Sequence, residues 1–482
     1  MATISSTGIG SGLDVATIVN QLMALERRPL GLLQQSASEL NTQVSAIGKL
    51  RSLTSALRDA SNSLSSLTLW GQTKATSSNS AAVTVSTAAG AVAGNYAIHV
   101  GNLAASQTVY SGSFANAQST LNEGSLTIEL GSWTGEPSPS GFTAKAGTSP
   151  LAITIGPEDT SLEAIRDKIN AAGAGVTASL INDAGGTRLS LRSTTTGAEN
   201  GFRVTASETV DDGNPATGLS ALAYDATNPS STLTRSETAV NANATINGIA
   251  VSSATNTLAG VSDGLTIQLL QKTTTAVDVS VASDTEAVRG AITSFVSAFN
   301  AVASYLRDQT KYDAASKTGG TLQGDRLATG LQSQLRGLIN QGSTASATFE
   351  RLSDIGISFS TDGTLVTSSS KLDNALKNLP ELKKVLSTDG VDAASSGFID
   401  RFKDFTALVL GSEGSFESRD KSLQSMLSSN SKRQASMNTR LTLVEARLYK
   451  QYQTLDTNLA QLNSVSSYLT QQLAMLNNNS KS

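Results

Sequence analysis

The chain has 482 residues, a net charge of −4 and a sequence pI near 5.3, which argues against sequence-independent nucleic-acid binding. It contains no cysteine and one histidine, which excludes disulfides, thiolate zinc sites, cysteine nucleophiles and His-rich metal sites. A chain of this length is too long to fold around a single hydrophobic core. Only 15% of its residues are charged and 4% are aromatic, and both fractions are low for a globular enzyme. We therefore expect several domains and a structural role without a cofactor or metal.

The N-terminal sequence predicts helices and no ordinary targeting signal. MATISSTGIG lacks a basic region followed by an apolar run, and no stretch of the chain reaches the roughly 18 consecutive apolar residues of a membrane-spanning helix. Ser11 and Asp14 have capping-box spacing, which predicts a helix start, and Pro29 marks a kink or stop. Apolar residues in steps of three and four fall on both sides of that proline, at Val15, Ile18, Leu22, Leu25, Leu40, Val44, Ile47, Leu50, Leu57, Leu64 and Leu67.

β-Type sequence occupies the middle of the chain. Alternating runs such as YAIHV and SLTIEL predict strands. From Leu151, a strand, a short helix opened by the pair Thr160 and Glu163, and a hairpin turning at residues 183–186 predict an α+β module. Residues 207–236, rich in Gly, Asn, Pro and Ser, are expected as loop or mobile surface.

Strands resume after this loop, so the module is expected to be inserted into a β-domain built from both sides. Asn247-Gly248 predicts a type I′ hairpin turn, and Asp362-Gly363 predicts a second hairpin within ISFSTDGTLVT. Helical repeats return between the two hairpins and after the second one. Helices are expected from Ser283, around residues 327–338, 371–387 and 392–410, and from near Phe416 to the C-terminal stalk.

The C-terminal sequence carries the longest apolar stripe, which alternates steps of three and four from residue 441 to residue 476. Sustained spacing of this kind is typical of a coiled coil, although an ordinary bundle core would explain one such helix alone. Because both ends of the chain carry a stripe, we expect them to pair as a stalk that becomes firmly ordered once neighbouring subunits add contacts. The residues expected to carry this assembly are Leu13, Ile18, Leu22, Leu25, Leu448, Tyr452, Leu455, Leu459, Leu462, Leu469 and Leu473.

The predicted fold class is α+β and multidomain. Terminal helices form a coiled-coil stalk, followed by a helical domain with a β-hairpin and two antiparallel β-rich domains inserted between them. The expected domains are the stalk (1–42 and 436–482), the helical domain (43–71 and 280–435), a β-rich domain (72–129 and 237–279) and an inserted α+β domain (130–236).

The two ends of the chain resemble the bacterial flagellar filament cap family, FliD or flagellar hook-associated protein 2. GSGLDVATIVNQLMALERRPL is similar to the family opening, and RLYKQYQTLDTNLAQLNSVSSYLTQQL is similar to its ending, with Tyr452 where the family usually has Phe. The segment from Leu151 to Val204 resembles a repeat module of flagellin and hook-associated proteins. The motif positions matched are Gly12, Leu13, Asp14, Leu22, Met23, Glu26, Pro29, Leu30, Leu455, Asp456, Tyr468 and Leu469.

This resemblance implies a structural protein and not an enzyme. It implies export through the flagellar type III apparatus without a cleaved signal peptide, and an extracellular location at the filament tip. The implied partners are further copies of the chain in a pentameric ring, flagellin, the hook–filament junction proteins and a cytoplasmic export chaperone at the C-terminal helix, with no nucleic acid and no membrane insertion. Such a cap helps incoming flagellin to fold and insert, and prevents its loss.

Two alternatives remain open from the sequence. One is a surface adhesin whose β-domains bind host glycans or mucin, and the other is a flagellin-like filament subunit with the same helix–β–helix plan. An enzyme acting on glycans is disfavoured, since the acidic pairs Glu158-Asp159 and Asp211-Asp212 are better explained as caps and turns than as a catalytic pair or a calcium site. His99, in a strand-like run, has no evident catalytic partner.

Overall fold

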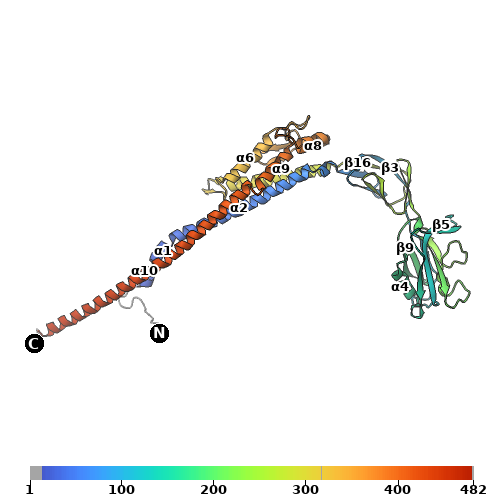
Figure 1. Cartoon of the computed structure of the whole chain (residues 1–482), viewed down its shortest axis with the longest axis horizontal. Coiled ribbons are helices and arrows are strands. Elements are labelled where there is room, and N and C mark those ends of the chain that lie inside the picture. The colour runs from blue at the N-terminus through green and yellow to red at the C-terminus, as the bar shows by residue number, and fades with distance from the viewer. Residues whose placement is uncertain (1–13, 316, 480–482) are drawn as a thin grey trace. The chain divides into compact units, whose positions relative to one another are not determined.

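The structure, a computed structural model, describes residues 14–315 and 317–479 (Figure 1). The chain folds into two compact units. The first contains the residues before Trp70 and those after Asp284, and the second contains everything between them. Each unit has its own core, so each is described by itself.

The first unit is helical. Two short hairpins, β17 (Tyr312–Asp313) with β18 (Thr318–Gly319) and β19 (Ile357–Phe359) with β20 (Leu365–Thr367), lie between its helices. The helices are α1 (Val15–Glu26), α2 (Arg28–Ser65), α3 (Leu67–Trp70), α5 (Thr285–Thr310), α6 (Arg326–Asn340), α7 (Ser369–Leu376), α8 (Leu379–Ser387), α9 (Phe398–Leu410) and α10 (Ser415–Asn479).

The apolar stripe of α2 explains where the helical core forms. Ile47, Leu50, Leu57 and Leu64 are buried, as their spacing predicts, and they face α5 and α9. Three phenylalanines complete this core: the Phe402 ring lies edge-on to Phe295 and Phe299, with centroids 5.1 and 6.0 Å away. Edge-to-face packing favours such rings beyond the area they bury. We call α5–α9, with the facing parts of α2 and α10, the helical body.

One core of the second unit lies between a five-stranded antiparallel sheet and a three-stranded one. Asn247 and Gly248 have φ of 50° and 82°, as a type I′ turn requires, and they join β12 to β13. The five-stranded sheet has the order β1 (Thr73–Ser77), β16 (Val277–Ser283), β3 (Gly94–Asn102), β12 (Ala242–Ile246), β13 (Ile249–Ser253), and the three-stranded sheet has the order β14 (Thr257–Ser262), β15 (Leu265–Leu269), β2 (Val83–Thr87).

The other core of the second unit packs helix α4 (Leu162–Ala172) with two four-stranded sheets. Ser161, and not Thr160 as predicted, caps α4 by accepting a hydrogen bond from the Ala164 N–H. The first sheet contains β10 (Gly201–Glu208), β5 (Gly124–Thr134), β6 (Gly141–Ala144) and β7 (Leu151–Ile155), and the second contains β11 (Thr234–Glu237), β4 (Thr108–Tyr110), β9 (Gly186–Ser193) and β8 (Val176–Asp183).

The predicted fold class is confirmed: helices and antiparallel sheets share one chain that ends in a long helix. The predicted domain boundaries remain predictions, although the α+β core begins as early as Val109. The helix expected over residues 371–387 is two helices, because Pro380 starts α8. Residues 207–236, expected as loop or mobile surface, place Leu219, Leu222 and Leu233 in the α+β core.

Candidate assembly surface

Helix α1 has a defined beginning and one fully buried side. The Asp14 carboxylate accepts hydrogen bonds from the Thr17 hydroxyl at 2.6 Å and from the Thr17 N–H at 3.0 Å, which lowers the pKa of Asp14. A side-chain cap of this kind fixes where a helix starts. From there Val15, Val19 and Met23 follow at intervals of four residues and are almost completely buried.

The side of α1 formed by these residues lies against α10, and the two helices run side by side (Figure 1). Val15, Val19 and Met23 pack with Leu441 in an apolar cluster that we call the seam. Partly buried residues complete it, namely Leu30, Met437, Val444, Leu448, Tyr449 and Tyr452. The expected pairing of the two ends of the chain therefore exists within the single chain.

Helix α2 continues the contact with α10 toward the helical body. Gln434 Nε2 donates to the Leu33 carbonyl at 3.4 Å, and Arg51 lies 3.9 Å from the Glu417 carboxylate. Residue numbers rise along α2 as they fall along α10, so the two helices are antiparallel. The polar contacts are long, and neither is fully buried, so they fix register more than they stabilise.

The structure separates the predicted stalk residues into groups. Leu13 lies outside the described residues. Leu448 and Tyr452 belong to the seam, whereas Ile18 and Leu459 are half-buried. The remaining residues are exposed in the single chain: Leu22, Leu25, Leu455, Leu462, Leu469 and Leu473.

The sequence predicts the outer apolar row of α1 as an assembly row, whereas the contacts with α10 are made by the inner row. VATIVNQLMALE contains two overlapping rows, one through Ile18, Leu22 and Leu25 and one through Val19 and Met23. Both have helical spacing, so periodicity alone does not separate them. The available signal was that the inner row keeps one unbroken interval of four residues from Val15.

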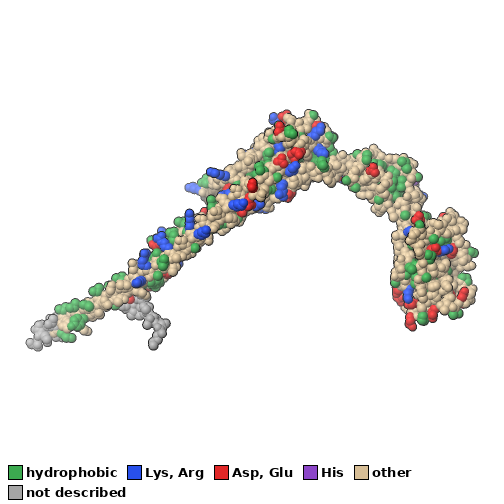
Figure 2. Space-filling model, in the orientation of Figure 1, with side chains coloured by type: hydrophobic (Ala, Val, Ile, Leu, Met, Phe, Trp, Pro, Cys, Tyr) green, Lys and Arg blue, Asp and Glu red, His purple; other side chains and the backbone are tan. Residues whose placement is uncertain are grey.

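The C-terminal part of α10 is uncovered. Every described side chain from residue 461 to residue 475 is exposed, although the apolar spacing of the seam continues through this part. Figure 2 shows hydrophobic side chains at the surface along this end of the helix. We call residues 455–475 the distal segment.

The opposite end of α10 is fixed to the helical body. Phe416 and Leu423 are fully buried, and Arg419 forms an ion pair with Asp325 at 2.8 Å. Asp325 also caps α6, because its carboxylate accepts from the Leu327 and Ala328 N–H groups at 2.9 and 3.2 Å. A single carboxylate thus joins the start of α6 to the start of α10.

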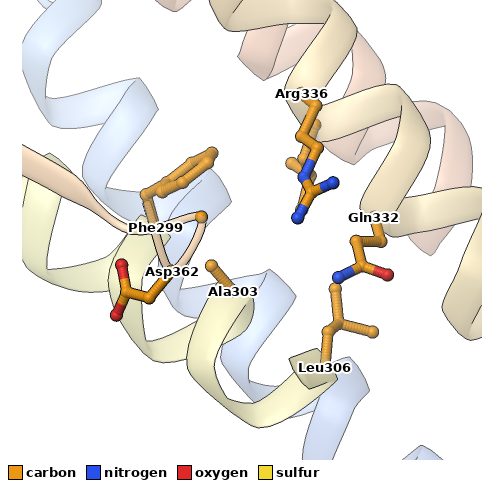
Figure 3. Close-up of a pocket in the computed structure, with 8 residues that line it drawn as sticks. Phe299, Ala303, Leu306, Gln332, Arg336 and Asp362 are labelled. Atoms are coloured by element: carbon orange, nitrogen blue, oxygen red, sulfur yellow. The ribbon is translucent and has the colours of Figure 1, made fainter. Parts of the chain in front are cut away.

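One cavity of the helical body, between α5 and α6, is too small for a small-molecule ligand. Figure 3 shows that cavity, where Phe299, Ala303 and Leu306 of α5 face Gln332 and Arg336 of α6. Its volume is about 10 Å³, roughly the space of a single water. Ligand pockets usually measure hundreds of cubic ångströms.

One cluster of carboxylates lies in the second unit. Glu208, Asp211 and Asp212 bring ligand atoms within 4.8 Å of one another. Glu208 accepts from Asn122 Nδ2 at 2.6 Å and from the Ser220 N–H at 2.8 Å, and Asp212 accepts from the Thr217 hydroxyl at 2.6 Å. The carboxylates therefore hold their own loops, as expected of caps and turns.

Among the described residues, no helix combines the length and the apolar character that crossing a bilayer requires. A long helical stalk with uncovered apolar side chains, in a chain that also contains antiparallel sheets, is typical of structural proteins that assemble.

Comparison with known proteins identifies the family. Residues 11–107 and 239–464 match the models described as the N-terminus and C-terminus of flagellar hook-associated protein 2, and residues 142–195 match the flagellin hook IN motif. The chain is 31% identical to flagellar hook-associated protein 2 of Escherichia coli K12 over the full length of both, and 31% identical to that of Salmonella typhimurium over 99% of this chain and 100% of the other.

A solved structure agrees with the sequence comparison. The D1-D2-D3 domains of the flagellar cap protein FliD from Escherichia coli match 79% of this chain and 99% of their own, with 29% identity and a TM-score of 0.57. The chain belongs to the flagellar hook-associated protein 2 (FliD) family, whose members are flagellar cap proteins. The resemblance seen at the two ends is thereby confirmed, and the cap family is favoured over a filament subunit.

Proposed function

We propose that this chain caps the distal end of the bacterial flagellar filament as a ring of identical subunits. The ring promotes the folding and insertion of exported flagellin and prevents its loss. Membership of the cap family supports the location, and the uncovered apolar row of the stalk supports the assembly.

The observation that carries the proposal is the exposure of apolar side chains at both ends of the stalk. Leu25 and Leu462 are 57% and 63% exposed although each lies on a row with coiled-coil spacing. Burying one leucine side chain contributes about 1.5–3 kcal/mol. Neighbouring subunits that cover several such side chains would therefore stabilise the stalk substantially, and the contacts can open when a subunit enters.

The remaining partners follow from the same proposal. They are flagellin, the hook–filament junction proteins and a cytoplasmic export chaperone. The chaperone binds the C-terminal helix, where apolar side chains are exposed. The chain leaves the cell unfolded through the flagellar type III channel. The lack of cysteine supports this route, because the unfolded chain cannot form cross-links before it arrives. Ring size is proposed as five.

The test replaces Leu459, which is half-buried and lies on the row that continues the seam. Leu459→Asp places a charge where an apolar contact is required, and we expect loss of ring formation and of filament growth in a strain that lacks its own cap. Leu459→Met is the matched control, since a volume-conserving apolar exchange costs under about 1.5 kcal/mol. Oligomer mass and filament length are measured for both variants.

Two results would count against the proposal. Normal rings and filaments with Leu459→Asp would show that this row does not carry assembly. The unaltered chain should also restore filament growth in a strain that lacks its own cap and exports this chain. If it does not, the proposed capping function is wrong.

A further inference from the structure

The part of α10 that contributes to the seam also carries a concentration of positive charge at its surface. Residues 432–450 contain five basic residues and one carboxylate, Glu445, a net charge of +4 in a chain whose total is −4. Figure 2 shows Lys and Arg side chains at the surface along this part of the stalk. We call the five basic residues, all of them exposed, the basic stripe: Lys432, Arg433, Arg440, Arg447 and Lys450. A local excess of one sign attracts partners of the opposite sign.

The described part of the chain supplies no partner for these charges. Among residues 14–315 and 317–479, none of the side chains of the basic stripe forms an ion pair with a carboxylate. Nearer the start of the same helix the basic residues are paired, because Arg419 lies 2.8 Å from Asp325 and Lys421 lies 3.5 Å from Glu417. Contacts within the described chain therefore leave the charge of the basic stripe without a counter-charge.

The spacing of the arginines places them in one row beside the seam. Arg433, Arg440 and Arg447 recur every seven residues, so a rotation of about 100° per residue leaves them within about 40° of one another around the helix. Arg440 and Arg447 each directly precede a residue of the seam, Leu441 and Leu448. In coiled coils, charged residues that flank the contact row set the choice of partner helix and its orientation.

An exposed leucine lies inside the basic stripe. Leu443 follows Arg440 by three residues and precedes Arg447 by four, the intervals at which side chains are neighbours on a helix surface. Its side chain is 68% exposed. A surface that serves solubility alone mixes charges of both signs and gains nothing from an apolar side chain. An apolar centre with a charged rim is instead typical of a surface that binds another protein.

From these observations we infer that the basic stripe and Leu443 form a docking surface for an acidic amphipathic helix of another protein. That helix carries carboxylates at intervals of seven residues, which pair with the arginines, and an apolar side chain that covers Leu443. The same stretch of a second copy of this chain is disfavoured as the occupant, because it would bring arginine against arginine. The surface is separate from the distal segment, and the inference goes beyond the proposed ring.

The test uses the full chain and two synthetic peptides of four heptads, both with leucine along one face. The acidic peptide has glutamate at the positions that flank this face, and the neutral peptide has glutamine there. Fluorescence anisotropy of the labelled peptides measures the dissociation constant at about 50 and about 500 mM salt. We expect binding of the acidic peptide alone, weakened at least about tenfold over this range because salt screens exposed charge pairs. Absence of binding by the acidic peptide would overturn the inference.

A variant that combines Arg433→Gln, Arg440→Gln and Arg447→Gln removes the row of arginines. We expect it to bind the acidic peptide at least about tenfold more weakly than the unaltered chain. The matched control combines Lys49→Gln, Lys74→Gln and Lys272→Gln, which removes the same charge from exposed lysines elsewhere. The control should bind as tightly as the unaltered chain. Equal losses in the two variants would mean that net charge alone attracts the peptide, contrary to the inference.

Leu443→Gln tests the apolar centre, since it keeps the charge and a good helix former in place. We expect about tenfold weaker binding of the acidic peptide, with the salt dependence unchanged. Unchanged affinity would leave ion attraction alone and contradict a docked helix.

Light scattering measures the oligomer mass of the triple arginine variant, which should equal that of the unaltered chain. A lower mass would make another copy of this chain the occupant, and the inference would then be wrong. Restoration of filament growth by the unaltered chain is measured separately, so the proposed function and this inference can fail independently.

Discussion

The helical body and the seam are both built from apolar helix faces, yet they are covered very differently. In the body, Phe402 is enclosed by α2, α5 and neighbouring helices and is fully buried. In the seam, only Val15, Val19, Met23 and Leu441 are buried, and the next apolar residues of α10 are progressively exposed. The difference teaches that the body folds on its own contacts, while the end of the stalk keeps apolar surface that the described residues do not cover.

The largest expected effect breaks the body. Phe402→Ala removes a ring that contacts Phe295 and Phe299, and leaves a cavity that surrounding helices cannot fill. We expect a loss of about 3–5 kcal/mol in the free energy of unfolding. Denaturant unfolding of the full chain measures it. A loss below about 1 kcal/mol would show that the body is not the self-sufficient part.

A smaller and local effect is expected in the seam. Met23→Ala should cost about 2 kcal/mol, the low end for a buried methionine, because few elements surround it. Hydrogen exchange should accelerate in α1 and in the facing part of α10, and stay unchanged in residues 285–410. Leu22→Ala, on the outer row of the same helix, is the control and should change neither. Equal acceleration throughout both units would contradict a local seam.

The smallest expected effect is a pH dependence inside the body. Glu381 accepts hydrogen bonds from Lys384 Nζ, the Ser346 hydroxyl and the Ala347 N–H at 2.7, 2.7 and 2.8 Å. These contacts, that of Lys384 first, lower the pKa of Glu381 from 4.5 to about 2. Because the folded pKa is depressed, the contribution to stability is complete above pH 4.5 and is lost as the pH falls toward about 2.

Glu381→Gln removes this titration, so acid unfolding should depend less steeply on pH across that window. Lys384→Gln removes the first of the three contacts and should give an intermediate dependence. The comparison is made by following helix content against pH for the three proteins. Identical acid transitions for the unaltered chain and Glu381→Gln would contradict the assignment.

Much of the fold could be predicted because local chemistry decides it. A type I′ hairpin turn requires positive φ at both central positions, which Asn and Gly adopt most readily, and Asn247-Gly248 has that geometry. The stripe of α2 from Ile47 to Leu64 was predictable because one helix face meets one core. The apolar repeat continues through residues 371–387 and predicts one helix there, but Pro380 in the first turn of α8 separates two helices.

The candidate surface was predicted less well, for a physical reason. Periodicity reports that a side chain is apolar at the right interval, and not which molecule covers it. Leu448 and Leu462 have the same place in the repeat, yet one lies in the seam and the other is exposed. Among the described residues, the cover that α1 gives to α10 ends where α1 begins, at Val15.

Helix α10 is one uninterrupted element of 65 residues, about 97 Å at 1.5 Å per residue. No loop or proline divides it between Phe416, held inside the body, and the distal segment. No kink interrupts the helix, so a twist applied to its free tip is passed along α10 and is resisted first by the seam and then by the contacts of its root. The Arg419–Asp325 pair stands at that root, at the start of α6. Rotation of the tip therefore loads the contacts of this root, which are the Arg419–Asp325 pair, the Arg51–Glu417 contact and the buried side chains of Phe416 and Leu423.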